Sequence, residues 1–177
     1  MCQILTIAGL ERELKRCPLN EKTDIAAFIM FSDVELTVAS AEELLKKCPE
    51  FDVILTAESK GIPLGYEMSR QSGKPYVVAR KSVKLYMSNC VAVTVKSITT
   101  AAEQTLYLSA EKAELIKGKN VLIVDDVIST GESLNALEKL AENADGKIAA
   151  KAAVLAEGDA AERTDIIFLE KLPLFFK

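Results

Sequence analysis

The feature of this sequence that most limits its possible folds is a short apolar run at residues 121–124, followed at once by Asp125 and Asp126. Three of the four apolar residues are β-branched, which is typical of a central parallel strand covered on both faces. Two adjacent aspartates are rarely buried in a core. We therefore expect them at the carboxyl end of this strand, where open α/β sheets bind ligands.

A turn of small and hydroxylated residues follows the two acids. It contains Ser129, Thr130, Gly131 and Ser133, and it leads into a helix-like pattern at residues 134–140. The first N–H groups of a helix lack partners within the helix and lie at the positive end of its dipole, so this turn predicts an anion site. The alternative is an ordinary helix start, capped by Ser129 or Thr130.

A second apolar strand, at residues 52–57, also leads into a turn at the start of a helix. The turn occupies residues 58–61 and contains Lys60 and Gly61, while Pro63 stands where proline is favoured, in the first turn of a helix. This arrangement predicts a second anion site. On its own it fits an ordinary strand-to-helix connection equally well.

Further strands are expected at residues 76–79 and 148–156, so the chain predicts one α/β domain with a parallel sheet flanked by helices. A basic segment at residues 80–89 separates the first of these strands from a β-ribbon with arms at 91–97 and 104–108. No internal repeat or flexible linker interrupts the chain, and its 177 residues suit a single domain.

The first third of the chain is harder to interpret. Leu10, Leu14 and Cys17 lie at helical spacing before Pro18, which predicts a short first helix. Residues 25–31 form an apolar run that fits a strand or a lid over a flat ligand.

Within that run, Phe28 and Phe31 fit plain core at least as well as a lid. After the run, a helix is expected from Ser32 or Asp33 to Pro49.

Composition removes several classes of function. Histidine is absent, which excludes histidine-based triads and histidine zinc sites. The net charge of −4 argues against nucleic acid or an anionic membrane as the main partner. The four cysteines have no CxxC spacing, and the apolar run at residues 4–10 has neither the flanks nor the length of a signal peptide or membrane span, so we expect reduced thiols and a cytoplasmic protein.

The stretch at residues 121–133 resembles the phosphoribosyl-diphosphate (PRPP) motif of type I phosphoribosyltransferases. It has four apolar residues, two acids, two apolar residues and then Ser-Thr-Gly-x-Ser. The turn at 58–61 resembles the diphosphate loop of the same family, which often holds a strained peptide bond, so we expect a non-proline cis bond or a backbone outlier near Ser59 or Lys60. The Arg-Lys-x-x-x-Leu pattern that starts at Arg80 resembles the flexible loop of adenine-type and xanthine-type members.

The resemblance implies a Mg²⁺-dependent purine phosphoribosyltransferase, in which a base and PRPP give a nucleoside 5′-monophosphate and diphosphate. It also implies a small hood with a contribution from about residues 1–35, a flexible loop and ribbon at 80–108, and a homodimer. Carried over residue by residue, the catalytic groups are Asp125, Asp126, Lys84 and Arg80, and the two aspartates hold metal through water. The 5′-phosphate would be bound by Ser129, Thr130, Gly131, Glu132 and Ser133; the diphosphate by Glu58, Ser59, Lys60, Gly61, Arg80, Lys81 and Lys84; and the base by Phe28, Val127 and Glu157.

The base is the least determined part of this interpretation. Adenine-type members carry a glutamate in the ribbon where this chain has Thr100, which favours a xanthine-type enzyme. Xanthine-type members tend to have a lysine where this chain has Gly158, which favours adenine. Adenine is our expectation. A xanthine or hypoxanthine enzyme, or a non-catalytic regulator that senses PRPP or a nucleotide, stays open.

Overall fold

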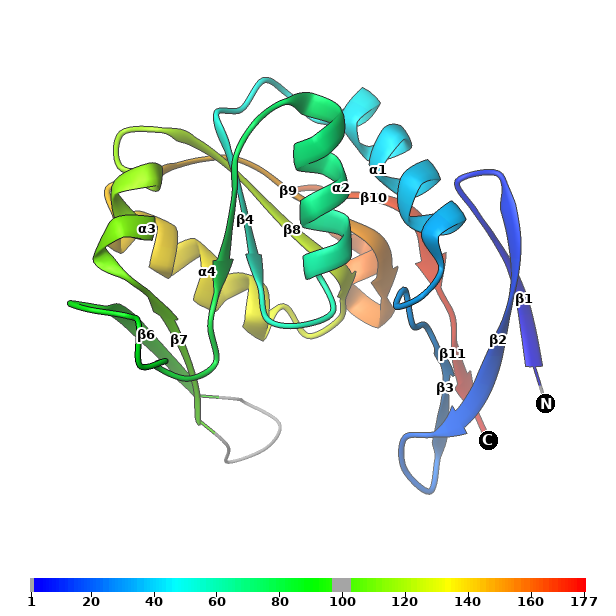
Figure 1. Cartoon of the computed structure of the whole chain (residues 1–177). Helices are drawn as coiled ribbons and strands as arrows, with labels where there is room; N and C mark the ends of the chain where they lie inside the picture. Colours follow the sequence, from blue (N-terminus) through cyan, green and yellow to red (C-terminus); the bar gives the residue numbers. More distant parts are fainter. Residues whose placement is uncertain (1, 97–102) are drawn as a thin grey trace.

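The computed structural model describes residues 2–96 and 103–177. Its main sheet has five parallel strands in the order β10-β9-β8-β4-β5 (Figure 1). The strands are β4 (Val53–Ala57), β5 (Tyr76–Ala79), β8 (Asn120–Ile128), β9 (Lys147–Glu157) and β10 (Ile167–Leu172). The parallel sheet predicted from the apolar runs is confirmed.

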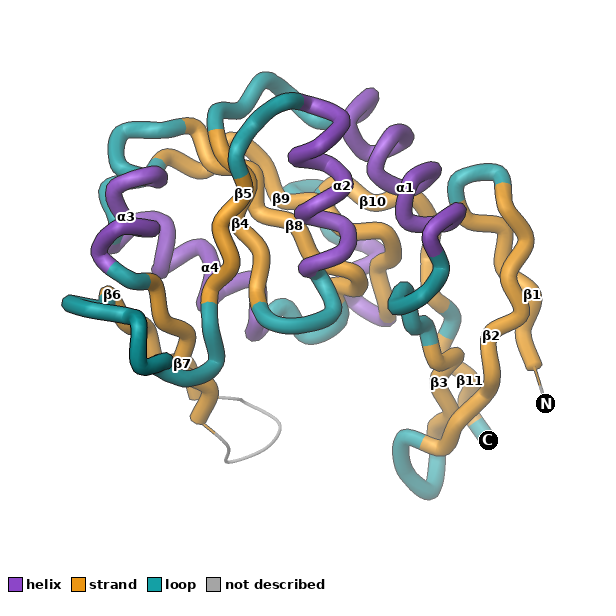
Figure 2. The backbone as a smooth tube through the Cα atoms, viewed as in Figure 1, coloured by secondary structure: helices purple, strands orange, loops and turns teal. Residues whose placement is uncertain are grey.

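Helices cover both faces of this sheet (Figure 2). On one face lie α1 (Val34–Lys47) and α2 (Ile62–Ser72), and on the other lie α3 (Ala110–Ile116) and α4 (Glu132–Asn143). Alternate residues of each central strand enter opposite cores, so Ile123 packs towards α4 while Leu122 packs towards α1 and α2. This two-sided burial explains why the central strands are continuous apolar runs.

The central strand β8 continues past the two aspartates to Ile128, further than the apolar run predicted. On one side it stays paired with β9 along this extension. On the other side its pairing with β4 ends at Val124, which pairs with Thr56. Asp125 and Asp126 are therefore inside a strand but beyond its last pair with β4, which itself ends at Ala57, and this opens the side of β8 that faces β4.

The predicted helix at residues 10–17 is wrong, because this segment is strand β2 (Leu10–Pro18). It pairs with β1 (Cys2–Ile7) across a turn in which Ala8 has a φ of 50° and Gly9 a φ of 79°. The alternation was hidden by arginines at inward positions. Arg12 donates from Nε to Asp33 Oδ2 at 2.6 Å, and the Arg16 guanidinium lies 3.9 Å from the centre of the Phe175 ring.

A small antiparallel sheet forms one end of the molecule, with the order β1-β2-β3-β11 (Figure 1). Strand β3 (Thr23–Ala27) confirms the strand interpretation for residues 25–27 of the apolar run, while residues 28–31 follow outside the strand. Strand β11 (Leu174–Phe176) pairs with β3 from the other end of the chain. The helix expected after Ser32 or Asp33 is α1, and its first turn is capped by Asp33, whose Oδ1 accepts the Leu36 N–H at 3.0 Å.

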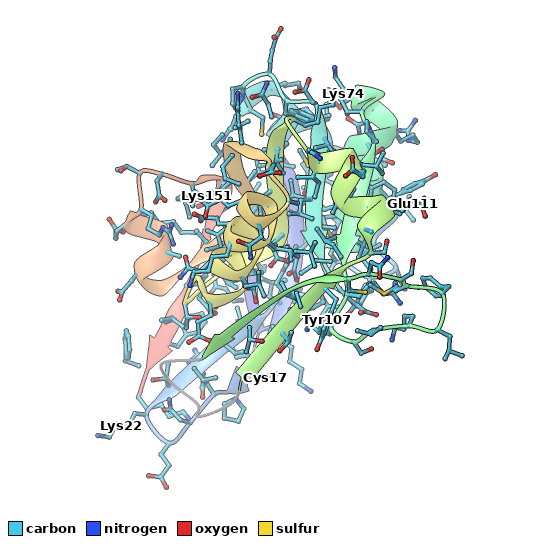
Figure 3. The ribbon with its side chains drawn as sticks, turned by 90° about the vertical axis from the view of Figure 1, so that its left-hand side faces the viewer. Cys17, Lys22, Lys74, Tyr107, Glu111 and Lys151 are labelled. Carbon is cyan, nitrogen blue, oxygen red and sulfur yellow. The ribbon has the colours of Figure 1, made fainter. Side chains whose placement is uncertain are left out.

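The predicted ribbon consists of β6 (Val91–Lys96) and β7 (Glu103–Leu108) and packs against α4. Its bend, which includes Thr100, lies outside the described residues. Arg80 and Tyr107 exchange backbone hydrogen bonds of 2.9 and 2.8 Å, which fasten the ribbon to the end of β5 (Tyr107 is labelled in Figure 3).

A 3₁₀ turn, η1 (Gly158–Glu162), links β9 to β10. All four cysteines are free thiols. Within the described ranges, no helix combines the length and apolar character needed to cross a membrane.

Candidate active site

The turn at residues 129–133 connects the end of β8 to the start of α4. Gly131 precedes the helix in the left-handed region, with a φ of 79°, and no side chain caps the first turn. The alternative cap by Ser129 or Thr130 is therefore wrong. The turn lines a hollow of about 40 Å³ together with Asp125, so its N–H groups and hydroxyls remain available to a small anion.

The turn at residues 58–61 connects β4 to α2, with Gly61 in the residue position before the helix and no side-chain cap. The peptide bond between Glu58 and Ser59 is cis, which confirms the expectation of an unusual bond at this place. Gly61 approaches β4 and β8 closely. A Cβ built at this position would overlap Thr56 Oγ1 and would lie 3.0 Å from Asp125 Oδ1.

The two aspartates are tightly coupled. Asp126 is 3% exposed, and Lys60 Nζ lies 3.2 Å from its Oδ2. The Asp126 N–H donates to Asp125 Oδ1 at 2.9 Å. Burial, followed by the charge of Asp126, raises the pKa of Asp125 to about 7. A cation or a hydroxyl donor at this position would stabilise the ionised pair.

This raised pKa predicts that Asp125→Asn stabilises the ligand-free protein at alkaline pH. The folded-state pKa of about 7 lies above the ordinary aspartate value of 3.8, so the stability that protonation provides is complete below about pH 4 and is lost as pH rises through 7. Asparagine cannot ionise and avoids this loss. At pH 8 we expect urea unfolding to give the variant roughly 1–3 kcal/mol more stability than the wild type.

The difference should shrink as the pH falls towards 4. Glu114→Gln is the matched control, because it removes a carboxylate that is exposed on α3. Parallel stability curves for Asp125→Asn and the wild type between pH 5 and 8 would contradict the assignment.

The two turns and the acids share one depression in the surface. A hollow of about 190 Å³ is lined from both turns and from the ends of β4 and β8. Its lining is Ala57, Glu58, Ser59, Lys60, Lys81, Asp125, Asp126, Val127 and Ser133. Asp125, Val127 and Ser133 also line the smaller hollow, so the two cavities adjoin at the carboxylates.

The basic segment after β5 is fastened to this depression through Glu58. Arg80 Nη2 lies 3.4 Å from Glu58 Oε1, and the Lys81 N–H donates to Glu58 Oε2 at 3.0 Å. The bond from Lys81, helped by nearby cations, holds the pKa of Glu58 below its usual value. Lys84 is further along the segment, where its Nζ donates to Ser82 Oγ at 2.7 Å.

The three predicted base contacts lie in different environments. Val127 lines both hollows. Glu157 ends β9, and burial raises the pKa of its carboxyl while the charge of Lys60 opposes the rise. Phe28 is 5% exposed and packs in the core beside α1, so its contact with a base remains a prediction.

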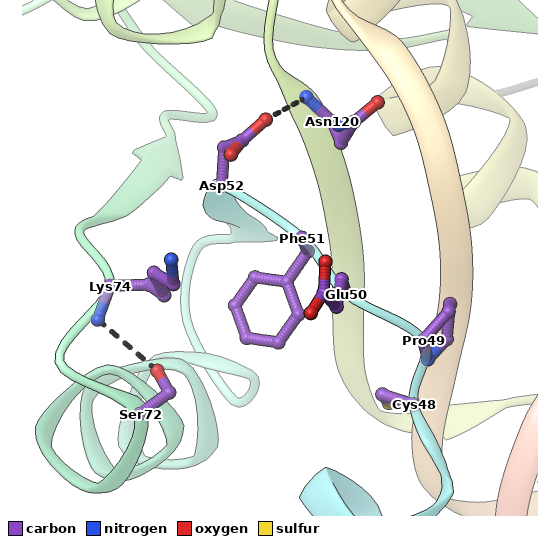
Figure 4. A pocket seen from close by; sticks show the side chains of 8 residues that line it. All are labelled: Cys48, Pro49, Glu50, Phe51, Asp52, Ser72, Lys74 and Asn120. Atoms are coloured by element: carbon purple, nitrogen blue, oxygen red, sulfur yellow. Dashed lines mark hydrogen bonds between the residues drawn. The ribbon is translucent and has the colours of Figure 1, made fainter.

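A larger hollow, of about 360 Å³, lies at the opposite end of the strands, where they begin (Figure 4). It is found where β4 and β8 begin, and Asp52 Oδ2 there accepts the Asn120 N–H at 2.8 Å. Size therefore does not identify the site. The adjoining smaller hollows are the ones that combine two open helix starts with buried carboxylates.

Two residues beside the turns received no role from the sequence. Thr56 lies under the Gly61 turn, and Arg163 lies against the Gly131 turn, where a Cβ would meet its Nη1 at 2.9 Å. The sequence hinted at Arg163 only indirectly: residues 129–133 contain no basic residue, so a cation beside this turn has to come from another part of the chain. The partner of Thr56 is a glycine, which leaves no pattern to detect.

Comparison with known proteins gives consistent matches. The family model described as "Phosphoribosyl transferase domain" matches residues 33–171. The hypoxanthine/guanine phosphoribosyltransferase of Methanothermococcus okinawensis is 32% identical over 161 residues, which cover 86% of this chain and 84% of the relative. The adenine phosphoribosyltransferase of Cenarchaeum symbiosum is 36% identical over 118 residues, 66% of each chain.

Among solved structures, adenine phosphoribosyltransferase from Thermoanaerobacter pseudethanolicus has a TM-score of 0.74. The match covers 90% of this chain and 95% of that chain at 22% identity, so it shows a shared fold.

Proposed function

This chain belongs to the phosphoribosyl transferase domain family, and from that premise we propose that it is a purine phosphoribosyltransferase with adenine as its preferred base. The reaction is transfer of the phosphoribosyl group of PRPP to the base, a pentosyl transfer of purine salvage. The observation that carries the proposal is the placement of two open helix starts on either side of Asp125 and Asp126.

PRPP has a matching distribution of groups, with a 5′-phosphate at one end, a diphosphate at the other and two ribose hydroxyls between them. On this proposal Ser129, Thr130, Gly131, Glu132 and Ser133 surround the 5′-phosphate, and the carboxylates of Asp125 and Asp126 accept from the hydroxyls. The diphosphate lies in the turn at 58–61, near Lys60. Arg80, Lys81 and Lys84 close over it.

The acids also fit Mg²⁺. A buried carboxylate whose pKa is raised is stabilised in its ionised form by a cation. Among the described residues, no group of three or more acidic, histidine or cysteine side chains is placed to hold a metal alone. Magnesium suits such a sparse site because it retains waters and binds substrate phosphates. When bound, it would supply positive charge to the diphosphate oxygens.

Transfer breaks the bond between the anomeric carbon and diphosphate and forms one to a ring nitrogen of the base, which loses its proton. This substitution at the anomeric carbon, which breaks a C–O bond and forms a C–N bond, is expected to pass through an oxocarbenium-like state, as glycoside cleavage does. The work of the protein is then to hold the two reactants in line and to stabilise charge on the leaving diphosphate. Basic side chains that close over the diphosphate and exclude water serve this purpose, and no histidine is required.

We infer that the small sheet forms the hood over the base, with Phe28, Val127 and Glu157 near it. The family match begins at residue 33, so β1, β2 and β3 lie outside it. The relatives include both adenine and hypoxanthine/guanine enzymes at similar identity, which makes the base the point to test. A homodimer, in which loop cations act on the neighbouring site, is part of the same proposal.

The test is to mix the protein with PRPP, Mg²⁺ and each of adenine, hypoxanthine, guanine and xanthine, and to follow nucleotide formation. We expect turnover with adenine, no turnover after removal of metal by EDTA, and none in the variant Asp125→Asn/Asp126→Asn. If another base is turned over and adenine is not, the proposed substrate is wrong but the proposed phosphoribosyl transfer is supported. Binding of PRPP without turnover of any base would contradict the enzyme and support a sensor of PRPP.

A further inference from the structure

Arg163 stands between η1 and β10, and a carboxylate holds its side chain in one orientation. Its Nε donates to Asp165 Oδ1 at 2.9 Å, and its Nη2 donates to Asp165 Oδ2 at 2.7 Å. This bidentate pairing fixes the plane of the guanidinium. It leaves Nη1 on the side away from Asp165.

That side faces the turn at the start of α4. A Cβ built on Gly131 would meet Arg163 Nη1 at 2.9 Å, so the guanidinium lies directly against the turn and uses the space that the glycine leaves open. The side chain of Arg163 is 30% exposed, so it is partly open to solvent beside the hollow that the turn lines.

The orientation is supported from two more elements. Lys151, on β9, places its Nζ 2.6 Å from Asp165 Oδ2 and 3.1 Å from Glu138 Oε1, on α4 (Lys151 is labelled in Figure 3). The Lys151 side chain is 15% exposed. Arg163 and Lys151 together hold the pKa of Asp165 far below its usual value, so the carboxylate that orients Arg163 stays ionised at any ordinary pH.

The turn itself lacks the charge that its proposed ligand needs. Residues 129–133 include one acid, Glu132, and no lysine or arginine. A phosphomonoester carries about −1.5 to −2 charges at neutral pH, and a helix start supplies the equivalent of only about +0.5. A cation from another part of the chain would therefore strengthen the binding of a phosphate at this turn.

We propose that Arg163 is that cation, and that its Nη1 binds the 5′-phosphate of the substrate beside the Gly131 turn, with Asp165 and Lys151 as positioning residues. The identity of the ligand rests on the proposed function; the placement of the cation rests on the contacts of Arg163. An arginine held in this way binds the 5′-phosphate end of the substrate and does not contact the bond that breaks during transfer.

The experiment compares Arg163→Gln, Arg163→Lys and the matched control Lys171→Gln with the wild type. Lys171 pairs with Glu162 of the neighbouring η1 turn at 2.6 Å and is exposed, so its loss changes the local net charge without altering the Gly131 turn. Calorimetry measures the Kd of ribose 5-phosphate, and steady-state kinetics separates kcat from the KM for PRPP.

For Arg163→Gln we expect about a 10- to 100-fold rise in both the Kd and the KM, with kcat within about threefold. Arg163→Lys should recover part of the affinity, and Lys171→Gln should match the wild type. Thermal unfolding of each variant, read with and without ribose 5-phosphate, separates binding from folding.

Equal affinity of Arg163→Gln and the wild type for ribose 5-phosphate would overturn the inference. Arg163 would then have only a structural role, in the ion pairs that connect the start of β10 with α4. Equal losses in Arg163→Gln and Lys171→Gln would also overturn it, because the effect would then be one of net charge. A wild type that binds ribose 5-phosphate but turns over no base would refute the enzyme, while a loss of that binding in Arg163→Gln would still support the phosphate contact.

Discussion

Replacement of Asp125 and Asp126 by asparagine is expected to lower kcat/KM for PRPP by at least about 10³-fold, with most of the loss in kcat. Both carboxylates lie where β4 has ended, and they share the hollow with the two turns. Asparagine keeps their size but removes the charge that would stabilise a cationic ribose and a metal-bound water.

Stability measurements distinguish this result from damage to the fold. Asp125→Asn should be more stable than the wild type at pH 8, so a loss of activity in that variant cannot come from unfolding. The measurement is initial rates over a range of PRPP concentrations for each single variant, for the double variant and for Glu114→Gln. Retention of more than a tenth of the wild-type activity in the double variant would exclude the two acids as the catalytic centre.

Gly61→Ala is expected to reduce activity about 10²-fold or more and to lower stability by about 1–3 kcal/mol. Gly61 has a φ of −73°, which alanine adopts without strain, so the effect comes from contact alone. The added methyl would overlap Thr56 Oγ1 and would press on Asp125, whose Oδ1 lies 3.0 Å from the position that the methyl carbon would take. The turn, the Thr56 side chain or β8 at Asp125 must shift to accept it.

Two companion variants test this explanation. In Gly65→Ala the methyl would lie 3.1 Å from Thr56 Cγ2, one helical turn further from the acids, so the loss of activity should be smaller. Thr56→Ala combined with Gly61→Ala removes the overlapping hydroxyl and should restore most of the stability. Steady-state kinetics and urea unfolding are measured for the whole set of variants. Wild-type kinetics in Gly61→Ala would contradict the explanation, because the turn would then accept the methyl group without disturbing the acids.

The centre of the main sheet could be predicted because β4 and the first half of β8 are buried on both faces and their apolar runs are unbroken, whereas the edge strand β10, with exposed Glu170 and Lys171, was not predicted. β2 could not, because its inward positions carry Arg12 and Arg16, whose charged ends reach Asp33 and the Phe175 ring. Those partners come from distant parts of the chain. A pattern based on hydrophobicity counts both arginines as exposed and leaves only the helical spacing of Leu10 and Leu14.

The candidate site also has a part that the sequence could predict and a part that it could not. Each turn directly follows an apolar strand in sequence, and the two acids belong to one of these strands, so residue type and spacing identified them. The alternative interpretation placed the cap of α4 on Ser129 or Thr130, but the residue before the helix is Gly131, which has a positive φ, and no side chain caps the first turn. Arg163 reaches the turn only through the adjacency of β9 and β10, which a linear pattern does not contain.

The pairing of β11 with β3 determines the order in which the molecule can be completed during synthesis on a ribosome. Leu174 pairs with Ile25, so nearly the whole sequence must emerge before the small sheet gains its fourth strand. The hairpin of β1 and β2 can form earlier from local contacts, and β4, β5 and β8 precede β11 in the chain, so they can also pair before it emerges. The nascent chain can therefore acquire the turns at 58–61 and 129–133 first, and the end that we expect to cover the base gains its last strand afterwards.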